Sequence, residues 1–85
     1  MASVSRRTLT RRFRQATGLA PGEWLQRERL RLARRLLETS EDPIERVARN
    51  AGYDTTVTMR AQFARDLHTS PRAYRQTFRA TAPDA

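Results

Sequence analysis

The chain has 85 residues and a formal net charge of +8, with 17 basic side chains, all of them arginine, against 9 acidic ones. Because it contains no cysteine, disulfide bonds and thiolate metal sites are excluded, and no apolar run is long enough for a membrane span or a signal peptide. We therefore expect a soluble, cytoplasmic protein without a membrane partner, whose thin core is held by apolar packing alone.

The positive charge is concentrated near the start of the chain. Five arginines precede the first acidic residue, Glu23, at positions 6, 7, 11, 12 and 14. Local charge of this kind favours a polyanionic partner, above all nucleic acid. Two alternatives are a solvated face, in which Arg replaces Lys through codon usage, and an acidic membrane surface. Codon usage explains the absence of Lys but not the local surplus of positive charge.

Every segment is expected to be helical, because apolar residues recur at three and four positions and no run alternates. The first helix is predicted over Ser5 to Thr17, with Ser5 as its N-cap and Gly18 closing it in the left-handed conformation. Its apolar face consists of Leu9, Phe13 and Ala16.

A second helix is predicted from Pro21 to Glu38, with proline at the first helical position. At about 1.5 Å per residue it is about 27 Å long, the length of a spacer. Its expected buried stripe consists of Leu25, Leu30, Ala33, Leu36 and Leu37.

The second half of the chain predicts a helix-turn-helix. A capping-box-like start at Asp42 to Glu45 opens a short helix that ends at Gly52, and a further helix runs from about Thr56 to Leu67. The short helix is expected to bury Ile44, Val47, Ala48 and Ala51. A final helix, capped by Ser70-Pro71 and extending to about Phe78, can dock on the core through Ala73, Tyr74 and Phe78.

The chain also repeats itself at a spacing of fifty residues. Thr8-Leu9 and Phe13 align with Thr58-Met59 and Phe63, and Pro21 and Trp24 align with Pro71 and Tyr74. This repetition predicts two copies of one unit. The helix from Pro43 to Asn50 precedes the second copy and has no counterpart before the first, so the first unit is expected to be incomplete. Trp24 and Tyr74 are expected to anchor the core rather than stack on bases.

A helix-turn-helix places the outward face of its second helix in the major groove. In the second unit Met59 and Phe63 point inward, so Thr56 and Arg60 can bond to bases or phosphates and Val57 can touch a thymine methyl group, with Ala64 or Asp54 beside them. The candidate DNA contacts are Thr55, Thr56, Val57, Thr58 and Arg60 in the second unit and Arg6, Arg7, Thr10, Arg11 and Arg14 in the first.

Exposed arginines are more often solvated or paired with an acid than bound to a ligand. Arg65 beside Asp66, and the arginines at 27, 31, 34 and 35 near acidic residues of the second helix, are interpreted as surface. His68 is the only histidine and has no second ligand within helical reach, and there is no glycine-rich phosphate loop. We expect no metal site, no cofactor and no catalytic residue, hence no enzyme.

An ordered set of motifs resembles the DNA-binding domain of AraC/XylS-family bacterial transcription regulators over about residues 5 to 79. The motifs are Arg7-x-Leu9-x-Arg11-Arg12-Phe13, Gly18-x-x-Pro21, Arg29-Leu30-x-x-Ala33-x-x-Leu36-Leu37, Ile44-x-x-Val47-Ala48-x-x-x-Gly52-Tyr53, and Phe63 through Ser70-Pro71-x-x-Tyr74-Arg75. The stretch from Thr55 to Phe63 is most similar to the branch that carries an amidase-like (DJ-1/PfpI) sensor domain ahead of the DNA-binding domain.

The resemblance implies an all-α, homeodomain-like fold of two helix-turn-helix units joined by a long linker helix. Residues 1–20 would be the remnant of the first unit with its recognition helix, 21–39 the linker, 40–79 the second unit with the C-terminal helix, and 80–85 a tail. It also implies double-stranded promoter or operator DNA as the partner, with base contacts from Arg7, Thr10 and Arg11 and from Thr56, Val57 and Arg60. A sensor domain and RNA polymerase would be the partners of a full-length protein at the nucleoid.

Three departures from the family pattern are expected to matter. Ala61 replaces an arginine that relatives usually have, and His68 replaces the glycine that commonly ends this helix, so that helix end is expected to be strained or rebuilt. The family also has two helices ahead of this segment, including the brace of the first unit. We expect a well-formed second unit and a loosened or differently packed first helix around Leu9 and Phe13.

Sequence-specific DNA binding is thus the leading interpretation. The alternatives are a nonspecific basic nucleic-acid-binding fragment that uses the first helix, and an interaction fragment that self-associates through Leu9 and Phe13.

Overall fold

The computed structural model describes residues 6–81, with side chains from Arg7 onward. Within that range it contains five α-helices and no strand. They are α1 (Arg6–Thr17), α2 (Pro21–Thr39), α3 (Ile44–Ala51), α4 (Thr56–Leu67) and α5 (Pro71–Thr81). The expected N-cap Ser5 and tail residues 82–85 lie outside the described residues. The all-α prediction is confirmed.

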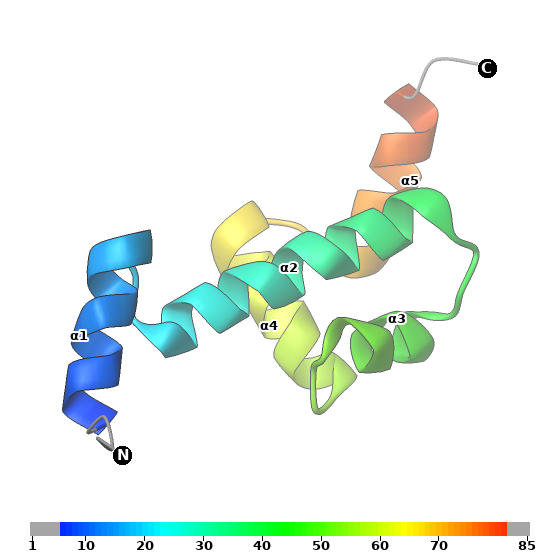
Figure 1. The fold of residues 1–85 in the computed structure, drawn as a ribbon. Coiled ribbons are helices and arrows are strands. Elements are labelled where there is room, and N and C mark those ends of the chain that lie inside the picture. The colour runs from blue at the N-terminus through cyan, green and yellow to red at the C-terminus, as the bar shows by residue number, and fades with distance from the viewer. Residues whose placement is uncertain (1–5, 82–85) are drawn as a thin grey trace.

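Helix α2 is the central helix, against which the other four helices pack. Helix α1 packs at its N-terminal end, whereas α3, α4 and α5 gather around its C-terminal two-thirds (Figure 1). The result is elongated, with extents of 54 × 26 × 24 Å and a Cα radius of gyration of 16.1 Å. A compact chain of this length would have a radius of gyration of about 12 Å.

The buried core belongs to the second unit. Periodic apolar positions of α2, α3 and α4 face one another there, which is what amphipathic helices require. The core consists of Ala33, Leu37, Val47, Ala48, Ala51, Tyr53, Met59 and Phe63, flanked by the partly buried Leu30, Leu32, Leu36, Ile44, Leu67 and Tyr74. The predicted inward positions Met59 and Phe63 are both fully buried.

Two predicted core residues at the other end of α2 are not buried. Leu25 was expected in the buried stripe and is 42% exposed, and the expected core anchor Trp24 is 39% exposed. Both lie on the part of α2 that projects beyond α3–α5 toward α1. Trp24 packs there against Phe13, edge to face, with ring centroids 5.6 Å apart.

The helix ends explain where the chain turns. Gly18 and Gly52 have φ angles of 77° and 96°, as predicted for residues that close α1 and α3. The predicted capping box at the start of α3 is wrong, because Pro43 rather than Asp42 occupies the N-cap position and no side chain caps the helix. The Asp42 carboxylate instead faces the Arg46 guanidinium at 3.8 Å.

Helix α5 begins as predicted, since the Ser70 Oγ accepts a hydrogen bond from the Ala73 N–H at 3.0 Å, and it continues past Phe78 to Thr81. Tyr74 anchors it by packing edge to face on Phe63, with ring centroids 6.0 Å apart. Phe78 does not dock and is 36% exposed. His68, at the end of α4, has a φ of 55°, so the strain expected where glycine is missing is present.

Candidate nucleic-acid interface

The turn between α3 and α4 fixes the angle of the candidate recognition helix of the second unit. The N–H groups of Gly52 and Tyr53 donate to the carbonyls of Arg49 and Ala48, at 3.1 and 2.9 Å. Gly52 can adopt its left-handed φ without a Cβ clash, and the small Ala48 is 2% exposed where the two helices approach. The turn and the buried Phe63 together hold α4 firmly against the core.

A buried polar network fixes the rear face of α4. The Tyr53 hydroxyl donates to Gln62 Oε1 at 2.6 Å, and Gln62 Nε2 donates to the Gln26 carbonyl at 2.9 Å and to Asp66 Oδ2 at 3.3 Å. Gln62 therefore ties α4 to α2. Burial raises the pKa of Tyr53 to about 12. Nothing in the sequence pattern indicated this network, because glutamine is ordinarily a surface residue.

The N-terminal half of α4 presents the side chains predicted to contact DNA. Val57 is 70% exposed, Arg60 and Thr58 are exposed, and Thr56 is half-buried. Thr55 is the N-cap, and its Oγ1 accepts from the Thr58 N–H at 3.2 Å and shares a hydrogen bond with the Thr58 hydroxyl at 3.1 Å. These two hydroxyls are thus engaged in starting the helix, whereas Thr56, Val57 and Arg60 face outward.

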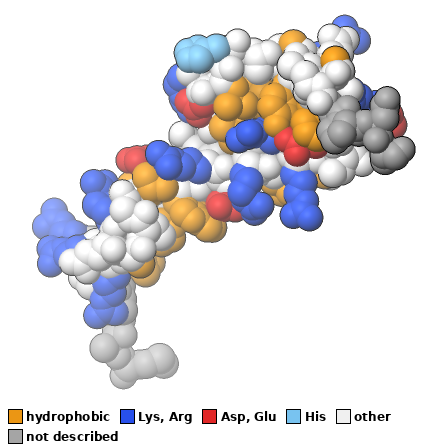
Figure 2. Space-filling view, turned by 90° about the horizontal axis from the view of Figure 1, so that it is seen from above, with side chains coloured by type: hydrophobic (Ala, Val, Ile, Leu, Met, Phe, Trp, Pro, Cys, Tyr) orange, Lys and Arg blue, Asp and Glu red, His pale blue; other side chains and the backbone are white. Residues whose placement is uncertain are grey.

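The other predicted contacts lie on α1. Arg7, Arg11 and Arg14 are exposed, and Thr10 is half-buried. The side chain of Arg6 lies outside the described residues. Figure 2 shows arginine side chains gathered at the α1 end of the molecule and spread along its length. The structure therefore presents two candidate surfaces, a strongly basic one on α1 and a mostly uncharged one on α4.

These two surfaces are held apart by α2. The helix has 19 residues, which corresponds to about 28 Å, and α1 and α4 pack on different parts of it. Successive major-groove segments on one face of B-DNA recur at about 34 Å. A rigid spacer of this length fits the separation between two neighbouring groove segments.

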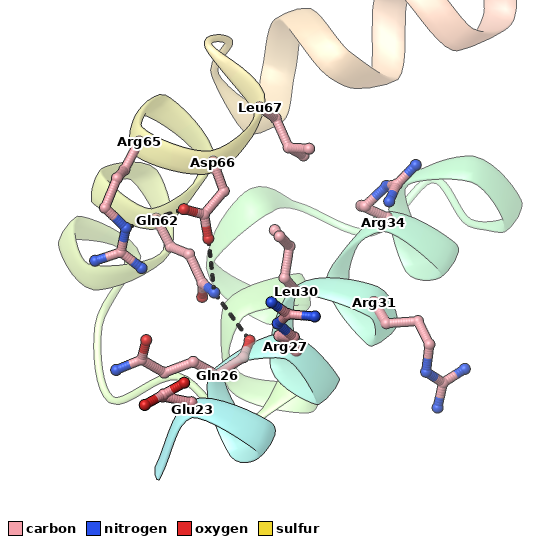
Figure 3. Close-up of a pocket in the computed structure, with 10 residues that line it drawn as sticks. All are labelled: Glu23, Gln26, Arg27, Leu30, Arg31, Arg34, Gln62, Arg65, Asp66 and Leu67. Atoms are coloured by element: carbon pink, nitrogen blue, oxygen red, sulfur yellow. Dashed lines mark hydrogen bonds and ion pairs between the residues drawn. The ribbon is translucent and has the colours of Figure 1, made fainter. Parts of the chain in front are cut away.

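A hollow of about 580 Å³ lies between α2 and the C-terminal half of α4, away from Thr56 and Val57 (Figure 3). Two of the arginines that line it are paired with acidic side chains. Arg31 binds Glu28 at 2.9 Å, and Arg65 binds Asp66 at 3.0 Å. The hydrogen bond from Arg65 holds the pKa of Asp66 below its usual range. The interpretation of Arg31 and Arg65 as paired surface residues is therefore confirmed.

Arg34, also interpreted as surface, has a further role that the sequence did not reveal. Its Nε donates to the Tyr74 hydroxyl at 3.2 Å and its guanidinium lies 5.6 Å from the ring centre, while that hydroxyl donates to Glu38. These contacts fasten α5 to α2.

No set of three or more acidic or histidine side chains within metal-binding reach occurs in residues 6–81. None of the helices in that same stretch is long and apolar enough to cross a membrane.

Comparison with known proteins identifies the family. The helix-turn-helix domain family matches residues 1–77, which is most of the chain. The chain belongs to the AraC-type helix-turn-helix domains.

Among its relatives, the transcriptional regulator Rv1931c of Mycobacterium tuberculosis is 40% identical over 77 residues, covering 91% of this chain and 30% of the relative. The transcriptional activator RhaS of Escherichia coli is 40% identical over 74 residues, covering 87% of this chain and 27% of the activator. The chain thus spans less than a third of the length of these regulators.

Two solved structures share the fold. The DNA-binding domain of the global transcriptional factor AdpA, crystallised with a target DNA, superimposes with a TM-score of 0.90 and 47% identity, covering 95% of this chain and 73% of that one. The C-terminal domain of the response regulator yesN from Fusobacterium nucleatum has a TM-score of 0.77 at 24% identity, covering 84% of this chain and 69% of that one.

Proposed function

We propose that this AraC-type domain binds double-stranded DNA sequence-specifically as the DNA-binding module of a bacterial transcription regulator. The observation that supports the proposal is the outward face of α4, which the buried core holds in a fixed position. The DNA-binding domain of AdpA, crystallised with a target DNA, has the same fold. The role is one of binding, without enzymatic activity. Promoter or operator DNA is the partner, and the site of action is the bacterial cytoplasm, at the nucleoid.

Within this proposal α4 reads bases in one major-groove segment. Val57 contacts a thymine methyl group, Arg60 binds a guanine edge and Thr56 bonds to a base or phosphate. The hydroxyls of Thr55 and Thr58 are already bonded to each other at the start of α4, so these residues contact DNA by lying next to it and not by donating a free hydrogen bond.

Helix α1 enters the neighbouring segment. In this proposal Arg7, Thr10 and Arg11 contact bases, Arg14 contacts a phosphate, and Arg6 is a further DNA contact. In this proposal α1 belongs to the first unit, residues 21–39 form the linker and residues 40–79 the second unit. In a full-length regulator the partners are a sensor domain, of the amidase-like type that the Thr55–Phe63 stretch suggests, and RNA polymerase.

The test is selection of bound sites from random duplexes by the parent chain and by Arg60→Ala. We expect the parent to select a site, and the variant to lose preference at one base pair by about 1–3 kcal/mol, which is about 5- to 150-fold. Arg35→Ala is the control, because Arg35 is an exposed arginine of α2 outside both candidate surfaces. The variant and control must retain the parent's circular dichroism spectrum.

A second candidate function is nonspecific binding of nucleic acid, which the arginines of α1 favour. In that case no site is selected, random competitor displaces every duplex equally, and Arg60→Ala changes only the salt dependence. Self-association is the third, favoured by Leu9, which is 59% exposed on the same helix as Phe13. Sedimentation that depends on protein concentration would reveal it.

A further inference from the structure

A second hollow, of about 600 Å³, lies where the N-terminal ends of α3 and α5 meet α4. Three arginines line it, Arg60 from α4 and Arg72 and Arg75 from α5, together with a single carboxylate, Glu45 of α3. None of the candidate DNA contacts other than Arg60 belongs to it. The hollow is therefore a basic site with one edge on the proposed reading surface.

The positive charges of this hollow are not neutralised by the protein. Among the described residues, none of the three arginines takes part in an ion pair. Arg75 Nε donates to the Leu37 carbonyl at a long 3.4 Å, and its buried Nη2 has no hydrogen-bond partner. A buried guanidinium nitrogen left without an acceptor is costly, so an anion in this place would be stabilised.

The hollow lies near the face of α4 that carries Thr55 and Thr56, because one residue borders both. Glu45 lines both this hollow and a smaller one of about 260 Å³ at the start of α4, and that smaller hollow is also lined by Thr55 and Thr56. Arg60 connects the same face with Arg72. A duplex with its major groove on α4 would therefore bring a strand of its backbone toward the α5 side.

We propose that Arg72 and Arg75 form a binding site for one backbone phosphate of the DNA, on the strand that borders the groove segment read by α4. This inference rests on the proposed function. A phosphodiester offers two unesterified oxygens, which match the paired N–H donors of a guanidinium. Arg72 is exposed and contacts the phosphate directly, whereas the half-buried Arg75 attracts the phosphate through its positive charge. Glu45 opposes the phosphate and limits its affinity.

The first experiment measures DNA affinity against salt for the parent chain, Arg72→Gln and the control Arg35→Gln. Each change removes one positive charge from an exposed side chain, and only the first lies in the hollow. Loss of one phosphate contact lowers the slope of log K against log salt by about 0.9, which corresponds to about eightfold at 0.1 M salt relative to 1 M. We expect Arg72→Gln to show this loss equally for selected and random duplexes, with base preference unchanged. Glu45→Gln should raise affinity, again for all sequences.

The second experiment locates the phosphate. Duplexes carrying a neutral methylphosphonate at single backbone positions are bound to the parent and to Arg72→Gln. We expect one position at which the substitution weakens the parent several-fold and leaves Arg72→Gln unaffected, which is the coupling that a direct contact requires.

Four outcomes would overturn the inference. If Arg72→Gln binds DNA as Arg35→Gln does while the parent selects its site, the phosphate site is wrong and the proposed function stands. If, in addition, the variant binds a polyglutamate peptide more weakly than the parent, the hollow takes an acidic protein partner. If inorganic phosphate raises the melting temperature of the parent and not of Arg72→Gln, with no coupled backbone position, the site takes a free anion. A parent chain that selects no duplex overturns the proposed function and this inference together.

Discussion

The C-terminal end of α2 lies in the buried core, whereas its N-terminal end contacts the arginine-rich helix α1. At its C-terminal end the core side chains Leu37, Val47 and Phe63 have no solvent exposure. At its N-terminal end Leu9 is 59% exposed, and Trp24, which is 39% exposed, packs against Phe13. The arginines of α1 lie at this less buried end. Packing and charge are thus concentrated at opposite ends of one helix.

This separation has a consequence for DNA binding. A contact made by charge alone is the same for every sequence and weakens as salt rises, whereas a base contact needs a rigidly held side chain. Helix α4 is fixed by the core and by Gln62, while α1 packs on the N-terminal end of α2, where Phe13 meets Trp24. We therefore expect the second unit to supply most of the selectivity and the first most of the salt-dependent affinity.

The largest expected effect is a difference in the free energy of unfolding between two alanine variants, made at phenylalanines in matching repeat positions. Phe63→Ala should lower the free energy of unfolding by about 3–5 kcal/mol, because it empties a fully buried site. Phe13→Ala should cost less, about 1–2 kcal/mol, because the half-buried ring loses one edge-to-face pair and part of its apolar burial. A domain of this length has about 4–13 kcal/mol in total, so the first variant loses a large share of its stability. Urea unfolding followed by circular dichroism measures both.

The same samples report on the two ends separately, because Trp24 is the only tryptophan and lies at the α1 end. We expect its fluorescence to change at lower urea than the circular dichroism signal, and amide exchange at Leu9 and Phe13 to be faster than at Val47 and Phe63. Equal losses for the two alanine variants, with coincident transitions, would contradict the comparison.

The next effect is a loss of stability at high pH that is specific to the second unit. Burial raises the pKa of Tyr53 from 10.0 in the unfolded chain to about 12. Between these values the unfolded state has released the proton and the folded state has not, so stability falls as pH rises from 10 to 12. The two-unit shift corresponds to about 2–3 kcal/mol. Unfolding in urea at pH 9 and pH 12 measures it.

Tyr53→Phe is the matched control, because it keeps the ring in the core and removes the titrating hydroxyl together with its bond to Gln62. The pKa of Tyr74 is also raised, through burial and its hydrogen bond to Glu38, so a smaller decline of the same sign should remain in the variant. A decline as steep in the variant as in the parent would rule out Tyr53 as its source.

The periodicity of the sequence was sufficient to predict the helices and the core of the second unit. Met59 and Phe63 recur at helical spacing, and Gly18 and Gly52 mark turns that no other residue makes as easily. The error at Leu25 has a physical reason. Periodicity identifies the apolar face of a helix but not whether another helix covers it, and that part of α2 projects beyond α3–α5.

The candidate site was predictable to a smaller degree. The outward positions Val57 and Arg60 follow from the inward positions Met59 and Phe63, because one face of a helix implies the other. The arginine pair on α5 was not predicted as a site, since its significance depends on α3, α4 and α5 meeting in space. Polar contacts between distant segments, such as Gln62 with Gln26, leave no periodic trace in the sequence.

The smallest effect is a gain in stability at the end of α4. His68 closes the helix at a φ of 55°, and this backbone conformation costs a residue with a Cβ about 1–2 kcal/mol. Glycine would avoid this strain, but it would offset part of the gain because its unfolded chain has more conformational entropy to lose on folding. His68→Gly should therefore raise the free energy of unfolding by about 0.5–1 kcal/mol, seen as a higher urea midpoint at an unchanged slope.

Gly52→Ala, at a φ of 96°, is the matched control and should change stability in the opposite direction. Both positions lie within the second unit, at the ends of α3 and α4, so a shift of the circular dichroism transition without a shift of the early Trp24 signal would show that the two ends of α2 unfold separately. A destabilised His68→Gly variant would mean that the imidazole makes a stabilising contact worth more than the backbone strain.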